Sequence, residues 1–205
     1  MSFYLPVQGD RGFTIAFYPN PRDEFGAFAN GYRCAADLLA RSLLARPGYR
    51  DYEAYPIVFL YRHSLELSLK NIIYKGAKLV SFRDLSSVDS ELHNRHRLPN
   101  LAQVASAVLN VLFPSDGKLH EVMDSARATA RDLDEIDPLS QSFRYPIDRE
   151  GNYGTKAPLS LGIVAISRHM SGLLEELDTI NFGLNIEIDQ AEAVFEILQS
   201  LRHSS

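Results

Sequence analysis

The segment from Tyr55 to Tyr74, YPIVFLYRHSLELSLKNIIY, constrains the fold more than any other part of the sequence. Its apolar residues cover most of the circumference of a helix, which is typical of a helix enclosed by several neighbours. At about 100° per residue, one stripe of this helix nevertheless carries four polar side chains, namely Arg62, His63, Glu66 and Lys70. Buried charges are costly unless they are paired, so this polar stripe is either an internal ionic network or one wall of a functional site.

Helical spacing of apolar residues also appears on both sides of this segment. A first helix is expected to begin near Asn20, which is a suitable N-cap, and to end before Pro47. The central helix is expected to run from about residue 52 to about residue 75 and to end before Gly76, because glycine is a weak helix former.

Four further helices follow in the same way. The third is expected to open at Pro99, and the fourth covers about residues 117–136. The fifth covers about residues 159–180, and the last begins at Asp189, where Glu192 is placed to complete a capping box.

Together these segments predict an all-α protein, an antiparallel helical bundle with one irregular insertion. Residues 1–19 lack a helical period and are expected to form an N-terminal arm. Residues 20–205 are expected to form a single bundle domain, in which residues 137–158 make an irregular loop or a short hairpin.

Composition limits the classes of protein to which the chain can belong. The formal net charge of -5 argues against a protein that coats nucleic acid through overall positive charge, although a local basic cluster can still hold a phosphate group. The single cysteine, Cys34, excludes an intramolecular disulfide and a cysteine-based zinc site. With no apolar run long enough to cross a bilayer and no signal peptide, we expect a soluble, cytoplasmic protein without a membrane partner.

The polar stripe is the first candidate site, and two interpretations of it stay open. Arg62 and Glu66 are four residues apart and can pair on the helix itself, which would neutralise the stripe without a ligand. In the other interpretation the stripe lines a polar cleft, where His63 transfers protons and Glu66 orients it or a ligand hydroxyl. Lys70 would then contribute a positive charge to a ligand.

The second candidate is HNRHRLPNL, residues 93–101, in which Arg95, His96 and Arg97 precede the start of a helix. Free backbone N–H groups and the helix dipole favour an anion there, and a phosphate group would suit the place. His93 and His96 are three residues apart, but no third ligand is near, so neither a metal nor a cofactor is expected. The alternative is a solvated basic turn.

The third candidate is SFRYP, residues 142–146, inside the insertion. Arg144 lies between Phe143 and Tyr145, and it is held stiffly because the following proline restricts the backbone and the aromatic rings can serve as buried anchors. Arg144 and Tyr145 could thus be presented to a cleft. The alternative is a packed aromatic loop in which Arg144 pairs with Asp137 or Asp148.

These three motifs together resemble a subgroup of bacterial HEPN-like proteins. In that subgroup a helix with the pattern H/A-x-x-E-L-x-L-K precedes an H-x-L-x-x-L segment and a later FRYP, as do YRHSLELSLK, HRLPNL and FRYP in this chain. The resemblance covers about residues 25–180. The matching positions are Glu66, Lys70, His96, Leu98, Leu101, Phe143, Arg144, Tyr145 and Pro146.

The resemblance implies an antiparallel bundle, often dimeric, in a superfamily associated with toxin–antitoxin pairs, phage defence and RNA processing. Active HEPN ribonucleases usually carry an arginine followed about four to six residues later by a histidine, and this chain lacks that spacing. The resemblance therefore implies a partner in RNA or nucleotide biology more firmly than it implies cleavage.

Two functions remain to be compared. If the protein is a metal-independent ribonuclease, we expect His96 to be the acid–base group, Arg144 to stabilise charge on the phosphorus and Glu66 to orient them. The expected ligand contacts are then Arg62, His63, Lys70, Arg95, Arg97 and Tyr145. If it is a non-catalytic module, the same residues form an ionic network, and an exposed face of the bundle joins a second copy or a partner protein. Catalysis requires the three motifs to lie close together in space.

Overall fold

Five α-helices make up most of the chain that the computed structural model describes, which comprises residues 25–48, 50–82, 96–138, 140–147, 150–151 and 160–203. They are α1 (Phe25–Leu44), α2 (Tyr55–Phe82), α3 (Leu98–Leu112), α4 (Gly117–Ile136) and α5 (Ile163–His203), and a short 3₁₀ turn, η2 (Asp51–Ala54), leads into α2. The described residues contain no β-strand. The predicted all-α bundle is confirmed.

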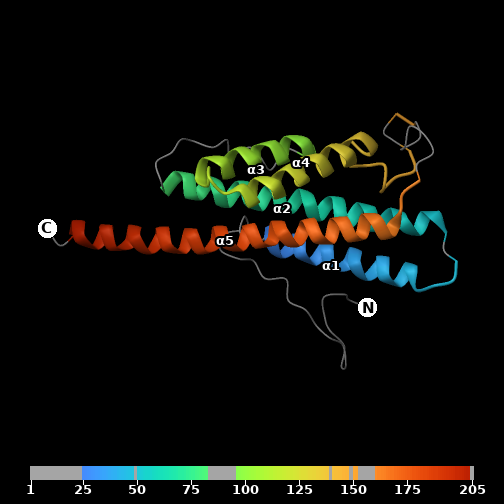
Figure 1. Cartoon of the computed structure of the whole chain (residues 1–205), viewed down its shortest axis with the longest axis horizontal. Coiled ribbons are helices and arrows are strands. Elements are labelled where there is room, and N and C mark those ends of the chain that lie inside the picture. The colour runs from blue at the N-terminus through green and yellow to red at the C-terminus, as the bar shows by residue number, and fades with distance from the viewer. Residues whose placement is uncertain are drawn as a thin grey trace, which may run out of the picture.

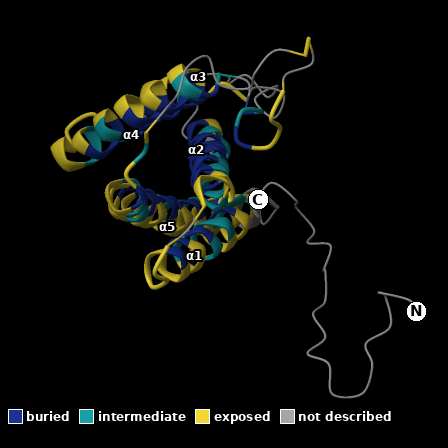
Figure 2. Ribbon diagram, turned by 90° about the vertical axis from the view of Figure 1, so that its right-hand side faces the viewer, coloured by how far each residue is buried: buried dark blue, intermediate teal, exposed yellow. Residues whose placement is uncertain are grey.

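The core is organised around α2. This helix lies between the pair α3 and α4 on one side and the pair α1 and α5 on the other (Figures 1 and 2). Side chains from opposite faces of α2 are almost completely buried, among them Ile57, Tyr61, Leu65, Leu69, Ile72 and Ile73. Burial on several faces explains why the segment is apolar around most of its circumference.

The central helix is longer than the sequence suggested. It does not end before Gly76 but continues to Phe82, and Leu79 and Val80 are buried in this extension. A Cβ added at Gly76 would collide with Cγ1 of Val108, a residue of α3. Gly76 therefore permits α3 to approach α2 closely, and the packing gained there outweighs the low helix propensity of glycine.

The expected break between a fifth and a sixth helix is also wrong. A single helix, α5, runs from Ile163 to His203, and Asp189 lies inside it rather than at its N-cap. Leu184 and Ile188, which lie within the expected break, are buried against the bundle. The amide of Asn181, also buried, donates to the carbonyl oxygen of Leu177 within the helix. Tertiary packing thus carries the helix through a polar stretch that resembles a cap.

The expected starts of the third and fourth helices agree with the structure, whereas the central helix begins at Tyr55 rather than at about 52 and α5 begins at Ile163 rather than at about 159. Pro99 lies in the first turn of α3, and α4 begins after Asp116, whose side chain accepts a hydrogen bond from the Leu119 N–H at 3.0 Å. The described parts of the insertion form turns and a single bridge residue, Ile147. The expected arm and the N-cap at Asn20 lie outside the described residues.

Replacing Gly76 by alanine is expected to destabilise the fold by about 1–3 kcal/mol, because the new methyl group must displace the stiff, buried side chain of Val108. Gly31 in the middle of α1 is the matched control, since a Cβ there would meet nothing within 4 Å. Gly31→Ala is expected to stabilise the protein by about 0.5–1 kcal/mol. Urea unfolding of both variants provides the test, and a Gly76→Ala protein as stable as the control would contradict the close approach.

Candidate functional site

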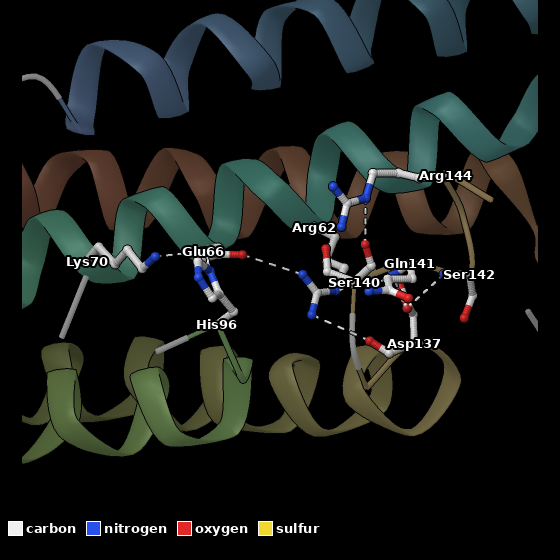
Figure 3. A network of polar contacts seen from close by, with 9 residues as sticks. All are labelled: Arg62, Glu66, Lys70, His96, Asp137, Ser140, Gln141, Ser142 and Arg144. Carbon is white, nitrogen blue, oxygen red and sulfur yellow. Dashed lines mark hydrogen bonds and ion pairs between the residues drawn. The ribbon is translucent and has the colours of Figure 1, made fainter. Parts of the chain in front are cut away.

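The polar stripe of α2 is buried in the bundle rather than open to solvent. Arg62 is fully buried, and Glu66 and Lys70 are each only 4% exposed. Figure 3 shows Glu66 between the other two, with the start of α3 on one side and the loop after α4 at the Arg62 end. Charges at this depth must be compensated by near neighbours, and the network supplies them.

Glu66 is the centre of this network. Its Oε1 accepts a hydrogen bond from Lys70 Nζ at 2.9 Å and lies 2.9 Å from His96 Nδ1, and its Oε2 lies 3.5 Å from Arg62 Nη1. Burial raises the pKa of Glu66, but the hydrogen bonds from Lys70 and His96 outweigh it and hold this pKa below its usual value. Glu66 is therefore an ionised carboxylate at neutral pH.

Arg62 connects α2 to the loop that follows α4. Its Nε lies 3.8 Å from Asp137 Oδ2, and its Nη2 donates to the Asp137 carbonyl oxygen at 3.4 Å. Burial lowers the pKa of Arg62, whereas the carboxylates of Asp137 and Glu66 oppose that effect. The guanidinium nevertheless stays charged, since arginine does not lose its proton in proteins. The Arg62–Glu66 pair expected from their spacing is thus confirmed, and Asp137 extends it.

Asp137 also fixes the course of the loop. Its Oδ1 accepts the backbone N–H groups of Gln141 and Ser142 at 2.7 and 3.0 Å. Ser140, which immediately precedes Gln141, has φ 58°. This left-handed conformation costs a non-glycine residue about 1–3 kcal/mol and persists only where its surroundings enforce it. The packed-loop alternative pairs Arg144 with Asp137 or Asp148, whereas in the structure Asp137 pairs with Arg62.

His96 is held by the network and still reaches solvent. Its side chain is 65% exposed, although its Nδ1 bonds to the buried Glu66. An ionised carboxylate can only accept a hydrogen bond, so we assign the proton to Nδ1. In the neutral ring Nε2 is then left as a proton acceptor, which is the arrangement of a histidine oriented by a carboxylate for acid–base chemistry.

Arg144 lies at the other end of the stripe. Its Nε donates to the Ser140 carbonyl oxygen at 2.6 Å, and its guanidinium carbon lies 5.4 Å from the centre of the Phe59 ring. The neighbouring Phe143 is a buried anchor whose ring is 6.4 Å from that of Tyr55. The prediction that both flanking rings are buried anchors is therefore right for Phe143 and wrong for Tyr145, which is 56% exposed. The alternative partner Asp148 lies outside the described residues.

The three motifs lie along one face of α2. His96 bonds to Glu66, and Arg144 stacks over Phe59, which is seven residues earlier on nearly the same face. Two helical turns correspond to about 10 Å along the axis. His96 and Arg144 therefore lie on the same face of α2 but about two helical turns apart. This separation suits an extended ligand better than a single reacting group, so the predicted role of Arg144 at the phosphorus beside His96 is not supported.

The remaining predicted residues differ in how far a ligand could reach them. Arg97 is 61% exposed in its side chain and donates to Asp134 Oδ2 at 2.7 Å, so part of its guanidinium faces solvent. Tyr145 is 56% exposed, with its ring centre 5.7 Å from the Arg144 guanidinium carbon. Lys70 is buried on Glu66, and Arg95 lies outside the described residues.

His63 packs between aromatic rings. It stacks on Phe59 with the ring centres 5.7 Å apart and meets Tyr32 edge-on at 4.6 Å. Burial lowers its pKa, so the ring is neutral at physiological pH. These contacts give His63 a packing role. The expected transfer of protons by His63 finds no support in them.

A metal site and a similarity to known proteins would each give independent information about the function of this site. Within the described ranges no group of three or more His, Cys, Asp or Glu side chains is placed to hold a metal ion, and no described helix could span a membrane. Comparisons with protein-family models, with curated proteins and with solved structures found no match. The functional interpretation therefore depends on the site itself.

Replacing Glu66 by alanine is expected to cost about 3–5 kcal/mol in the free energy of unfolding, because the buried charges of Arg62 and Lys70 lose their shared partner. Asp124→Ala is the matched control, since Asp124 pairs with Arg127 on the exposed surface of α4 and such pairs contribute about 1 kcal/mol or less. Urea unfolding followed by circular dichroism compares the two. Equal losses would show that the network contributes little to stability.

Proposed function

We propose that this chain is a HEPN-like protein of RNA or nucleotide biology, and that it cleaves RNA without a metal ion by using His96 as the acid–base group. The observation that supports this proposal is the 2.9 Å contact between Nδ1 of an exposed histidine and a buried, ionised glutamate. Such a pair fixes both the orientation and the tautomer of the imidazole.

In the proposed reaction Nε2 of His96 removes the proton from a ribose 2′-hydroxyl. The 2′-oxygen then attacks the adjacent phosphorus, the bond to the 5′-oxygen breaks, and the proton passes to that leaving oxygen. The products are a 2′,3′-cyclic phosphate and a free 5′-hydroxyl. Glu66 stabilises the imidazolium that forms in between, as a carboxylate behind a catalytic histidine does.

Two arginines are available to bind the phosphates of such a ligand. Arg97 follows His96 directly and keeps part of its guanidinium in solvent, so it is the nearer contact for the reacting phosphate. Arg144 lies about two helical turns away and would bind a neighbouring phosphate of the same strand. The exposed ring of Tyr145 beside it can stack on a base, which is the usual combination in proteins that bind single strands.

A second function, that of a non-catalytic interaction module, is favoured by a separate observation. The charges of Arg62, Glu66 and Asp137 compensate one another at full or nearly full burial, so these buried charges are paired without a ligand, although Nε and Nη1 of Arg62 make no hydrogen bond. In this alternative the network only stabilises the bundle, and His96 and Arg144 belong to a surface that a partner protein covers.

His96→Ala is expected to abolish cleavage of a single-stranded RNA in the presence of EDTA while shifting the melting temperature by only a few degrees, because most of the side chain lies in solvent. His169→Ala is the matched control: His169 is also exposed and makes one side-chain hydrogen bond, to Thr129 at 2.7 Å. The control is expected to retain the wild-type cleavage rate.

The substrate provides a further check on the mechanism. An oligonucleotide with 2′-deoxyribose at every position should stay intact, since it lacks the attacking oxygen. The ribonuclease proposal fails if the wild-type protein leaves RNA intact under these conditions, or if His96→Ala cleaves as fast as the wild type. An intact RNA together with a strongly destabilised Glu66→Ala protein would support the interaction module.

A further inference from the structure

A groove of about 350 Å³ lies between α5 and the start of α4, away from the proposed site. Its floor is apolar and consists of Phe113, Leu119, Val122, Ile180 and Leu184. Sites that bind small molecules have volumes of this order, with an apolar lining and a few polar groups that fix the orientation of the ligand. The polar groups of the groove therefore indicate which ligand it suits.

The charged side chains of the groove favour a positive ligand. Three carboxylates, those of Asp116, Glu176 and Glu187, line it together with one ammonium group, that of Lys118. Lys118 is exposed in the first turn of α4, so its flexible side chain can keep its charge in solvent. A ligand in the groove therefore meets mainly negative charge.

The end of the groove at Glu176 presents hydrogen-bond acceptors. The hydroxyl of Thr179, which also lines the groove, donates its proton to the Glu175 carbonyl oxygen at 3.0 Å. The Thr179 oxygen can then only accept a further hydrogen bond, as can the carboxylate of Glu176. An ammonium group has three donors and no acceptor, so it matches both side chains, whereas an anion finds no donor in them.

The α5 side of the groove has a carboxylate at each end. Glu176 and Glu187 lie about 16 Å apart along the helix axis, and Ile180 and Leu184 line the groove between them. If an N–H···O contact of about 3 Å is allowed at each end, about 10 Å remains between two ligand nitrogens. These dimensions suit two ammonium groups joined by a methylene chain.

From this geometry we infer that the groove binds a linear aliphatic diamine or polyamine. The methylene chain lies on the apolar floor, and an ammonium group lies near Glu176 at one end and near Glu187 at the other. Asp116, on the α4 side of the groove, adds a third negative charge. Burial of the chain contributes affinity, and the carboxylates select for positive charge.

This groove is separate from the proposed catalytic site. Phe113 of the groove follows the last residue of α3, whereas Arg97 precedes its first, so about 22 Å of helix lies between them. A diamine in the groove therefore leaves His96 accessible. The proposed cleavage of RNA and the proposed binding of a diamine can fail independently.

Isothermal titration calorimetry of the full chain tests the class of ligand. The probe is 1,8-diaminooctane, whose extended chain matches the distance between the two carboxylates. Octylamine keeps the chain but has one ammonium group, and 1-octanol has none. The probe is expected to bind about tenfold more tightly than octylamine, because it makes a second set of hydrogen bonds to charged groups. No detectable binding of the probe, or equal affinities for the probe and either control, would overturn the inference.

Two glycines of α5 test the location of the site. Gly183 lines the groove, and a Cβ there would meet nothing within 4 Å, so Gly183→Leu is expected to fill the groove without disturbing the fold. Its affinity for 1,8-diaminooctane should fall at least about tenfold, because the added side chain occupies the space of the methylene chain. Gly172→Leu is the matched control, since a Cβ at Gly172 also meets nothing within 4 Å and Gly172 does not line the groove.

Charge variants test the ammonium contact. Glu176→Gln keeps the size of the side chain, removes its charge and is expected to weaken binding of 1,8-diaminooctane about tenfold. Glu121→Gln is the control, since Glu121 is exposed on α4 outside the groove lining. Both proteins should melt within a few degrees of the wild type, because both side chains are exposed. Wild-type affinity in Gly183→Leu or Glu176→Gln would show that the groove is not the site.

Discussion

The full burial of the Arg62 guanidinium is the constraint on which the rest of the structure depends. A charge at this depth is tolerated only with close partners, and they come from two directions: Glu66 one turn along α2, and Asp137 from the loop after α4. The first contact pairs the Arg62 charge with the Glu66 carboxylate, which hydrogen bonds from Lys70 and His96 hold in its ionised form. The second fixes the loop, because the same Asp137 carboxylate binds the backbone of Gln141 and Ser142.

The candidate site follows from these two contacts. An ionised Glu66 can hold Nδ1 of His96 at the surface of the bundle, and a fixed loop can place Arg144 over Phe59. A buried network of this kind thus serves stability and at the same time positions exposed groups. The two functions that we compare differ only in whether those exposed groups act on a phosphate or contact a protein.

The parts of this arrangement that depend on residues close together in the sequence could be predicted from it. The helical period of the apolar residues identified the buried helix, and the four-residue spacing of Arg62 and Glu66 predicted their ion pair. The failures all involve contacts between distant segments. Gly76 resembles a helix end in the local sequence, because its contact with Val108 of α3 forms only in the folded protein. Asp137 was considered, with Asp148, as a partner of Arg144, because the local sequence does not show that Arg62 is fully buried and needs a carboxylate. The continuity of α5 through Asp189 likewise depends on the burial of Leu184 and Ile188.

The most direct test of this account is the tautomer of His96, which long-range ¹H–¹⁵N NMR spectra of the histidine rings report. The His96→Ala spectrum identifies the signals that belong to His96. The account predicts that the neutral ring carries its proton on Nδ1, donated to Glu66, with Nε2 unprotonated and open to solvent. A ring protonated on Nε2, the common form of an unconstrained histidine, would contradict the central claim that the buried network orients His96.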